Sequence, residues 1–291
     1  MATQETFDRS KITPAHAAKD IAVITKRNLL RNLRLPQLLI FATVQPVMFL
    51  LLFNYVFGGA IGQAIPPIAQ GKYINWLLPG LLIQVAAFGA GQTALGLTED
   101  LSKGVIDRFR SLPMARSAVL AGRTLSDVIR NGFVISLMVI MGFLMGFRYQ
   151  TSFFGFIAGL AVAMIFAYSL SWIMAAIGLA VKSPEAAQSA VFLPVFPLVF
   201  ASSVFVPTQT MPDWLRAFAE VQPITVTTNA LRGLMLGRDA LAEFGPGINP
   251  VQALADAPSV EGQVLLSLLW SIAILIVFIP LSVRVYRRTV G

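Results

Sequence analysis

The sequence predicts an all-α integral membrane protein with six transmembrane helices, and three observations support this prediction. Apolar residues occupy 56% of the 291 positions and charged residues only 12%, whereas soluble domains average about 45–50% and about 25%. The mean hydropathy is +0.73. Six apolar segments are long enough to cross a bilayer, which takes roughly 20 residues of helix. An ordinary soluble protein is excluded, and so is a disordered chain, which needs low hydrophobicity and high net charge.

The six expected spans are almost free of Asp, Glu, Lys and Arg. They lie near residues 38–58, 76–98, 128–147, 155–178, 186–206 and 263–283. Arg130 stands at the start of the third, which is the least clean of the six. The chain thus divides into a cytoplasmic N-terminal segment, residues 1–36, and a six-span transmembrane domain, residues 37–291.

The distribution of Lys and Arg predicts that both termini are cytoplasmic. Of the 22 basic residues, 17 lie in the N-terminal segment, the loop after the second span, the turn at Lys182 and the C-terminal tail, against five on the opposite side. Cytoplasmic loops carry such an excess. The net charge of +8 has the same origin, because basic residues beside spans meet the anionic lipids of the inner leaflet. This explains the charge better than nucleic-acid binding does.

Residues 15–35 predict an amphipathic helix on the membrane surface. At about 100° per residue, one face collects apolar side chains and another collects Lys and Arg. The apolar face consists of Ala18, Ile21, Ala22, Thr25, Leu29 and Leu33. Pro36 disfavours a continuous helix into the first span. The alternative is a plain cytoplasmic extension of that span.

The loop between the second and third spans, residues 99–127, predicts a short cytoplasmic helix over 99–112 that Pro113 ends. Leu101, Val105 and Phe109 recur every four residues and therefore share one helical face. Charged residues flank this stripe: Asp107, Arg108 and Arg110. An apolar stripe of this kind suits docking into a groove on a partner. A loop folded back on the membrane surface is the alternative.

The fifth span contains Pro194 and Pro197. Each proline removes a backbone donor, so we expect the helix to bend or break there. A gating hinge and a harmless kink both remain open.

Residues 207–237 predict two short helices before the last span, with Pro212 and Pro223 in their first turns and Gly237 as a C-cap. Neither helix is long enough to span. We expect a re-entrant hairpin that dips into the outer leaflet from outside, with Trp214 at the level of the lipid headgroups. An ordinary exterior loop is the alternative.

Several kinds of catalytic chemistry are absent from the sequence. There is no cysteine, and His16 is the single histidine, so a thiolate metal site and a histidine triad within the membrane are excluded. No phosphate-binding loop of the G-x-x-x-x-G-K-[ST] type occurs, and we expect no metal or cofactor in this chain. None of the expected spans contains an acidic residue, which argues against a proton or sodium relay.

The polar groups within the expected spans are amides. These are Gln45, Asn54, Gln84, Gln92 and Gln188. We interpret them as interhelical hydrogen-bonding groups in preference to substrate contacts.

Taken together, this pattern resembles the permease subunit of type-2 ABC exporters. The segment VIDRFRSLPMARSAVLAGRTLSD is similar to the cytoplasmic loop of the daunorubicin-resistance permeases. The segment FPLVFASSVFVPTQTMPDWLRAFAEVQPITVTTNALRGLMLG is similar to their stretch from the fifth span to the exterior hairpin. The resemblance covers essentially the whole chain.

The resemblance implies a multi-pass subunit of the bacterial cytoplasmic membrane that exports a drug, antibiotic or lipid. Its implied partners are a second permease chain, identical or paralogous, and a separate ATPase that binds ATP and Mg. The helix at 99–112 would be the coupling helix that contacts the ATPase. The coupling residues would be Leu101, Gly104, Val105, Asp107, Arg108, Phe109 and Arg110. The substrate path would involve Asn54, Gln84, Phe88, Gln92, Pro194 and Pro197.

Two other classes of function stay open on the residues alone. A gradient-driven transporter or channel would need no ATPase. A membrane enzyme acting on lipids would need convergent ionisable groups, for which Asp213, Arg216 and Glu220 are the sole candidates. A helix with its charges on the watery face explains those three residues better.

Overall fold

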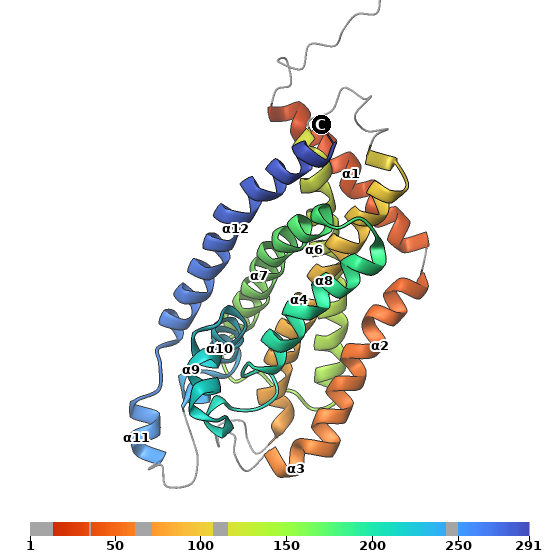
Figure 1. The fold of residues 1–291 in the computed structure, drawn as a ribbon. Helices are drawn as coiled ribbons and strands as arrows, with labels where there is room; N and C mark the ends of the chain where they lie inside the picture. The colour runs from red at the N-terminus through yellow and green to blue at the C-terminus, as the bar shows by residue number, and fades with distance from the viewer. Residues whose placement is uncertain (1–13, 35, 62–71, 107–115, 243–249, 291) are drawn as a thin grey trace, which may run out of the picture.

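The computed structural model describes residues 14–34, 36–61, 72–106, 116–242 and 250–290, and their regular structure is entirely helical (Figure 1). The long helices are α1 (Pro14–Arg34), α2 (Pro36–Leu52), α4 (Tyr73–Ser102), α6 (Arg116–Leu144), α7 (Phe153–Ala180), α8 (Pro184–Phe200), α10 (Pro223–Leu236) and α12 (Val260–Val290). The shorter ones are the π-helical turn η2 (Phe53–Phe57), α3 (Gly58–Ile61), η4 (Thr208–Thr210), α9 (Asp213–Val221), η5 (Arg238–Leu241) and α11 (Pro250–Ala255).

Four helices in the described part of the chain are long and apolar enough to cross a membrane. They cover Tyr73–Ser102, Ala118–Leu144, Phe153–Ala180 and Val260–Arg288. Two further apolar helices, Ala42–Phe57 and Pro184–Phe200, are shorter. These six segments fall where the sequence predicts spans. The structure therefore confirms that the described residues are all-helical, in agreement with a membrane protein, while the six crossings of the bilayer stay a prediction.

Helix α4 forms the centre of the bundle. It packs against α6, α7, α8 and α10, and 89% of its apolar window is buried, against 17% for α12 at the periphery. Glycines allow the closest approaches. A Cβ on Gly178 of α7 would lie 2.5 Å from the carbonyl oxygen of Ala94 in α4.

Helix α1 lies against α6 at the end of the bundle where the chain also terminates (Figure 1). Its buried residues are Ile24, Thr25 and Asn28, because Gly122 of α6 has no side chain and lets Ile24 approach. Arg31 bonds Asp100 of α4 at 3.2 Å. The contact of α1 with the bundle centres on Ile24, while Leu33 of the expected apolar face is exposed; the contact of that face with lipid stays a prediction.

The third expected span begins too late. Helix α6 starts at Arg116, so Arg123, Asp127 and Arg130 lie inside a continuous helix and are buried. Apolar content marks where a helix can enter lipid, but it does not mark where the helix begins. The apolar helix Ala118–Leu144 also contains Asp127, one residue before the predicted span.

The fifth expected span also differs. Helix α8 continues through Pro194 and Pro197 and ends at Phe200, so the helix does not break at the prolines, and the alternative of a bend there stays a prediction. The chain turns over residues 201–206 instead. The expected end at 206 is therefore wrong by six residues.

The two short helices before the last span are confirmed. Pro223 occupies the first turn of α10, Pro212 directly precedes α9, and Gly237 caps α10 with a φ of 97°. Helix α10 is buried against α4, α7 and α12, so this segment is an integral part of the bundle. An ordinary exterior loop does not fit this packing.

Candidate functional site

A lateral groove lies between α2, α4 and α6. It encloses about 540 Å³, including the space open to the outside. Helix α4 contributes Gln84, Phe88 and Gln92, which follow one another at four-residue spacing on one face. The remaining lining residues include Gln45 and Phe49 of α2 and Arg130 and Asn131 of α6. Three of the residues predicted for the substrate path are therefore brought together here.

The polar wall of the groove comes from α6. The Arg130 guanidinium donates through Nη2 to the carbonyl oxygen of Gly89 at 2.9 Å. Asn131 packs on the same glycine, where a Cβ would lie 1.9 Å from its Oδ1. Gly89 thus makes room for the amide of Asn131. Gln84 is 3% exposed, and its Oε1 has no hydrogen-bond partner within the described ranges, so that oxygen does not make the expected interhelical bond.

A buried ion pair lies one to two turns away on α6. Arg123 Nε donates to Asp127 Oδ2 at 3.0 Å, and the hydroxyl of Thr93 on α4 donates to the same oxygen at 2.9 Å. Gly96 leaves room for the guanidinium. Asp127 is therefore engaged by two donors, and Asp100 of α4 is engaged by Arg31. Both carboxylates are therefore paired with arginines within the protein. This pairing argues against a role for them in relaying protons across the membrane.

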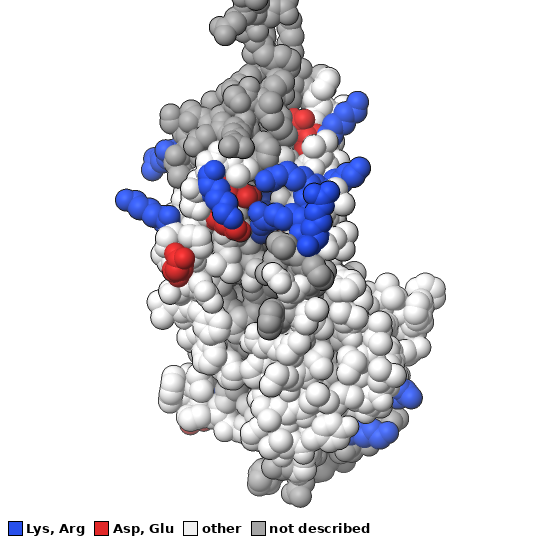
Figure 2. Space-filling model, turned by 90° about the vertical axis from the view of Figure 1, so that its right-hand side faces the viewer, with Lys and Arg blue, Asp and Glu red and all other residues white. Residues whose placement is uncertain are grey.

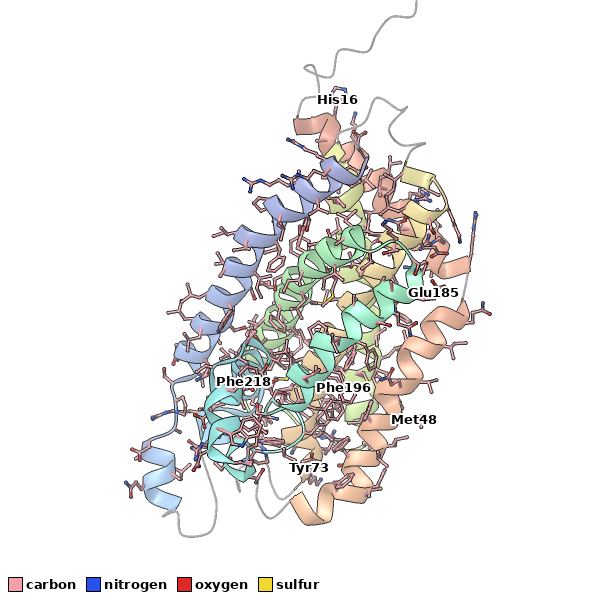
Figure 3. All side chains as sticks on the ribbon, in the orientation of Figure 1. His16, Met48, Tyr73, Glu185, Phe196 and Phe218 are labelled. Atoms are coloured by element: carbon pink, nitrogen blue, oxygen red, sulfur yellow. The ribbon has the colours of Figure 1, made fainter. Side chains whose placement is uncertain are left out.

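A row of aromatic rings leads from the groove along α8 to η2. Successive ring centroids are 4.3 to 5.7 Å apart. The members are Phe88, Phe192, Phe196, Phe200, Phe205 and Phe53. Phe196, in the C-terminal half of α8 (Figure 3), is 44% exposed. Val191, Val195 and Val199 are buried, whereas the rings are only partly covered.

The other predicted path residues lie outside the groove. Asn54 sits in η2 beside Phe53 and is half-buried. Pro194 and Pro197 are exposed on α8, on a face separate from the buried valines. These three residues border the aromatic row, and none of them lines the groove.

The predicted coupling helix is wrong at its start. Residues 99–102 are the last turn of α4, Lys103 follows as its C-cap, and Gly104 has a φ of 64°. Leu101 and Val105 are half-buried on either side of this turn and do not share one continuous helical face. Ile106 is buried against Leu97 and Leu120. Asp107, Arg108, Phe109 and Arg110 lie outside the described residues.

A buried arginine that the sequence pattern does not reveal, Arg232, lies near the N-terminal end of α4. Arg232 of α10 is 1% exposed and has no acidic ion-pair partner among the residues described. Its guanidinium lies 3.4 Å from the centroid of the Trp76 ring and donates to the carbonyls of Trp76 and Ser203 at 3.1 and 2.6 Å. The residue thus ties α10 to α4 and to the turn after α8.

The described part of the chain contains no group of three or more His, Cys, Asp or Glu side chains that could hold a metal ion. Asp213, Arg216 and Glu220 lie on α9, where Arg216 bonds Glu220 at 2.6 Å and both are exposed by more than a third. Arg216 and Glu220 form an ion pair on the surface of α9.

A bundle of long apolar helices with a lateral groove is the architecture of a multi-pass membrane protein. Comparison with known proteins makes the class specific. The sequence model of the ABC-2 type transporter family matches residues 19–236, and the chain belongs to that family. It is the membrane subunit of an ABC transporter, whose ATPase is a separate chain.

Curated relatives agree with this assignment. The chain is 33% identical over 277 residues to the daunorubicin resistance ABC transporter permease protein DrrB1 of Streptomyces coeruleorubidus, covering 94% of this chain and 89% of the relative. It is 23% identical over 248 residues to the probable doxorubicin resistance ABC transporter permease protein DrrC of Mycobacterium tuberculosis, covering 85% and 80%. The putative transport permease ycf38 of Cyanophora paradoxa is 23% identical over 229 residues, with 77% of each chain covered.

Proposed function

We propose that this chain exports a hydrophobic or amphipathic substrate, of the drug, antibiotic or lipid class, outward across the bacterial cytoplasmic membrane. The observation that carries the proposal is the similarity to a daunorubicin resistance permease over 94% of the chain. The groove supports it, because mixed aromatic and amide lining suits a molecule with apolar and polar parts.

The path of the substrate runs from the groove along the aromatic row. Gln84, Phe88 and Gln92 contact the substrate first, and the rings of α8 and η2 continue the path as far as Asn54. Pro194 and Pro197 lie beside it on α8. The half-exposed rings on α8 would face the second permease chain, so the path lies between two permeases.

The chain crosses the membrane six times with both ends in the cytoplasm, and the hairpin α9–α10 re-enters from outside. The excess of Lys and Arg at one end supports this orientation. Figure 2 shows the basic side chains gathered over the end of the molecule at which α1 lies, with few at the other end. The exposed Val23, Leu30 and Leu33 of α1 would enter the lipid boundary.

Coupling to the ATPase occurs at that cytoplasmic end. Leu101, Gly104 and Val105 form the end of α4 and the turn after it, and the coupling segment continues through Asp107, Arg108, Phe109 and Arg110. The ATPase would bind ATP and Mg and move this segment, which transmits the motion through α4 to the groove.

Affinity purification from native membranes in mild detergent, followed by mass spectrometry, tests the assembly. We expect a stoichiometric ATPase with a phosphate-binding loop, and either one or two kinds of permease chain. Inside-out membrane vesicles that contain this complex should then take up the substrate only when ATP is supplied. Purification of the chain without an ATPase, or export that a gradient alone drives, would contradict the proposal.

The double substitution of Asp107 and Arg108 by Ala should abolish ATP-driven export while the chain still inserts into the membrane, because it removes two charges from the ATPase contact. Export and membrane-inserted protein are measured in the same vesicle preparation. Substituting Lys182 by Ala, in the exposed turn before α8, is the matched control and should leave export unchanged. Full export by the double variant would show that the coupling residues are wrongly assigned.

A further inference from the structure

We infer that the groove between α2, α4 and α6 binds the anionic headgroup of an amphiphile, with Arg130 supplying the positive charge. This deepens the proposed function, on which it rests only for identifying the bound molecule as cargo of the transporter. The binding itself is a property of this chain and needs no ATPase.

The charge around the groove is unbalanced. Arg130 is 8% exposed and forms no ion pair within the described ranges. Asp127 lies one turn away on α6, but its Oδ2 already accepts from Arg123 and Thr93. Arg130 thus has no carboxylate of its own among the described residues. A buried charge is costly unless it is paired, so an anion in the groove would stabilise the Arg130 guanidinium.

Unpartnered polar atoms lie on the same wall. Gln84 Oε1, Arg130 Nε and Asn131 Nδ2 have no hydrogen-bond partner in the described structure, and all three residues line the groove. Each is more than nine-tenths buried, at 3%, 8% and 1% exposure. Buried polar atoms in native proteins have partners in the great majority of cases. These three atoms are themselves shielded from the groove, so a ligand there would complete their bonding with a small shift of the side chains that cover them.

The unpartnered atoms specify the chemistry of that ligand. Arg130 Nε and Asn131 Nδ2 are donors, and a phosphate or carboxylate oxygen would accept from both. Gln84 Oε1 is an acceptor, and a hydroxyl on the same headgroup would donate to it. A phosphorylated or acidic headgroup that also carries a hydroxyl therefore matches the polar wall.

The remainder of the groove is apolar. Ala42, Pro46 and Phe49 of α2 face Val85 and Phe88 of α4 across it, which suits a hydrocarbon chain. Among the described residues that line the groove, none is acidic. A cationic amphiphile would meet Arg130 without a counter-charge, and like charges at close range repel. The groove should thus prefer an anionic amphiphile to a cationic one of equal length.

The test is equilibrium binding of radiolabelled dodecyl phosphate to the purified full-length chain in an uncharged maltoside detergent. Competition uses unlabelled dodecyl phosphate, inorganic phosphate and dodecyltrimethylammonium. We expect saturable binding that the first competitor displaces and the other two do not. The Arg130→Gln variant should bind about tenfold more weakly or worse, since a charge-assisted hydrogen bond is lost. Arg130→Lys keeps the charge and should retain part of the affinity.

Arg148→Gln is the matched control, because Arg148 is exposed beyond the end of α6 and away from the groove. If dodecyltrimethylammonium displaced radiolabelled dodecyl phosphate from the wild-type chain as well as unlabelled dodecyl phosphate does, the inference would be overturned without any variant. A loss of affinity in Arg148→Gln as large as in Arg130→Gln would also overturn the inference. If inorganic phosphate displaced dodecyl phosphate, the site would bind free anions, and the inferred preference for an amphiphile would be wrong.

Mass spectrometry of lipids that copurify with the wild-type chain and with Arg130→Gln distinguishes two sources of the amphiphile. An anionic phospholipid retained by the wild type and lost by the variant identifies a bilayer lipid. Binding of dodecyl phosphate without such a lipid would show that the groove accepts an anionic amphiphile and retains no bilayer lipid. Because these binding measurements omit the ATPase, intact binding in a chain whose complex with its ATPase exports nothing would refute the proposed function and leave this inference standing.

Discussion

At the scale of a single residue, Arg232 makes the sharpest prediction about stability. Its buried guanidinium satisfies the carbonyls of Trp76 and Ser203 and covers the Trp76 ring. Arg232→Gln would leave buried acceptors without donors, so we expect a loss of at least about 2 kcal/mol, measured as a lowered midpoint of thermal unfolding in detergent. Arg216→Gln, which breaks an exposed pair on α9, should change stability by less than about 1 kcal/mol. Equal midpoints for the two variants would contradict the role of Arg232.

The sequence was informative for some of these residues and silent for others. Gln84, Phe88 and Gln92 could be chosen because amides and an aromatic ring in an apolar segment stand out. Arg232 could not be chosen, because a lone arginine in a short helix between spans looks like any exposed charge. Its burial comes from the packing of α10 against α4, which no local pattern encodes. Arg130 was visible, but the late start predicted for its helix placed it at an edge.

At the scale of elements, the crossing of α4 and α7 predicts that replacing a helical glycine by alanine lowers the stability of the protein, although this replacement usually stabilises a helix. Gly178→Ala would place a Cβ 2.5 Å from the backbone oxygen of Ala94 and disturb the bond from Thr98 Oγ1 to the Gly178 carbonyl, now 2.7 Å. We expect a destabilisation of about 1–3 kcal/mol from this overpacking. The midpoint of thermal unfolding measures it.

Gly59→Ala is the matched control for that crossing. Gly59 lies in α3 with open space around its Cα, and Ala is more favourable than Gly within a helix. The control should be neutral or slightly stabilising. If Gly178→Ala were as stable as Gly59→Ala, the close contact of α4 and α7 would not exist.

The elements themselves were mostly predictable, and the exceptions have one physical origin. Hydropathy located all six apolar segments because lipid contact demands apolar side chains. It mislocated the start of α6 because the first turns of that helix bury Arg123 and Asp127 against α4 instead of exposing them. It also suggested a break at Pro194 and Pro197, whereas α8 keeps its helical path through both.

At the scale of the whole molecule, the helical class and the family were predictable because composition and two long motifs carry them, whereas the groove was not. The groove needs α2, α4 and α6 to meet, and residues 42, 84 and 130 are far apart in the chain. The aromatic row likewise joins α4, α8 and η2. Such sites arise from the packing of distant segments, which periodicity within one segment cannot reveal.

The orientation of the molecule in the membrane makes the last prediction, and the absence of cysteine makes it simple to test. Ala186 near the start of α8 and Ala217 on α9 are both exposed, and they lie on opposite sides of the membrane if both termini are cytoplasmic. In intact cells, a membrane-impermeant maleimide should label Ala217→Cys and spare Ala186→Cys. Both should react after detergent solubilisation, which controls for accessibility. Labelling of Ala186→Cys in intact cells would reverse the orientation, and the basic end of the molecule would then face away from the ATPase.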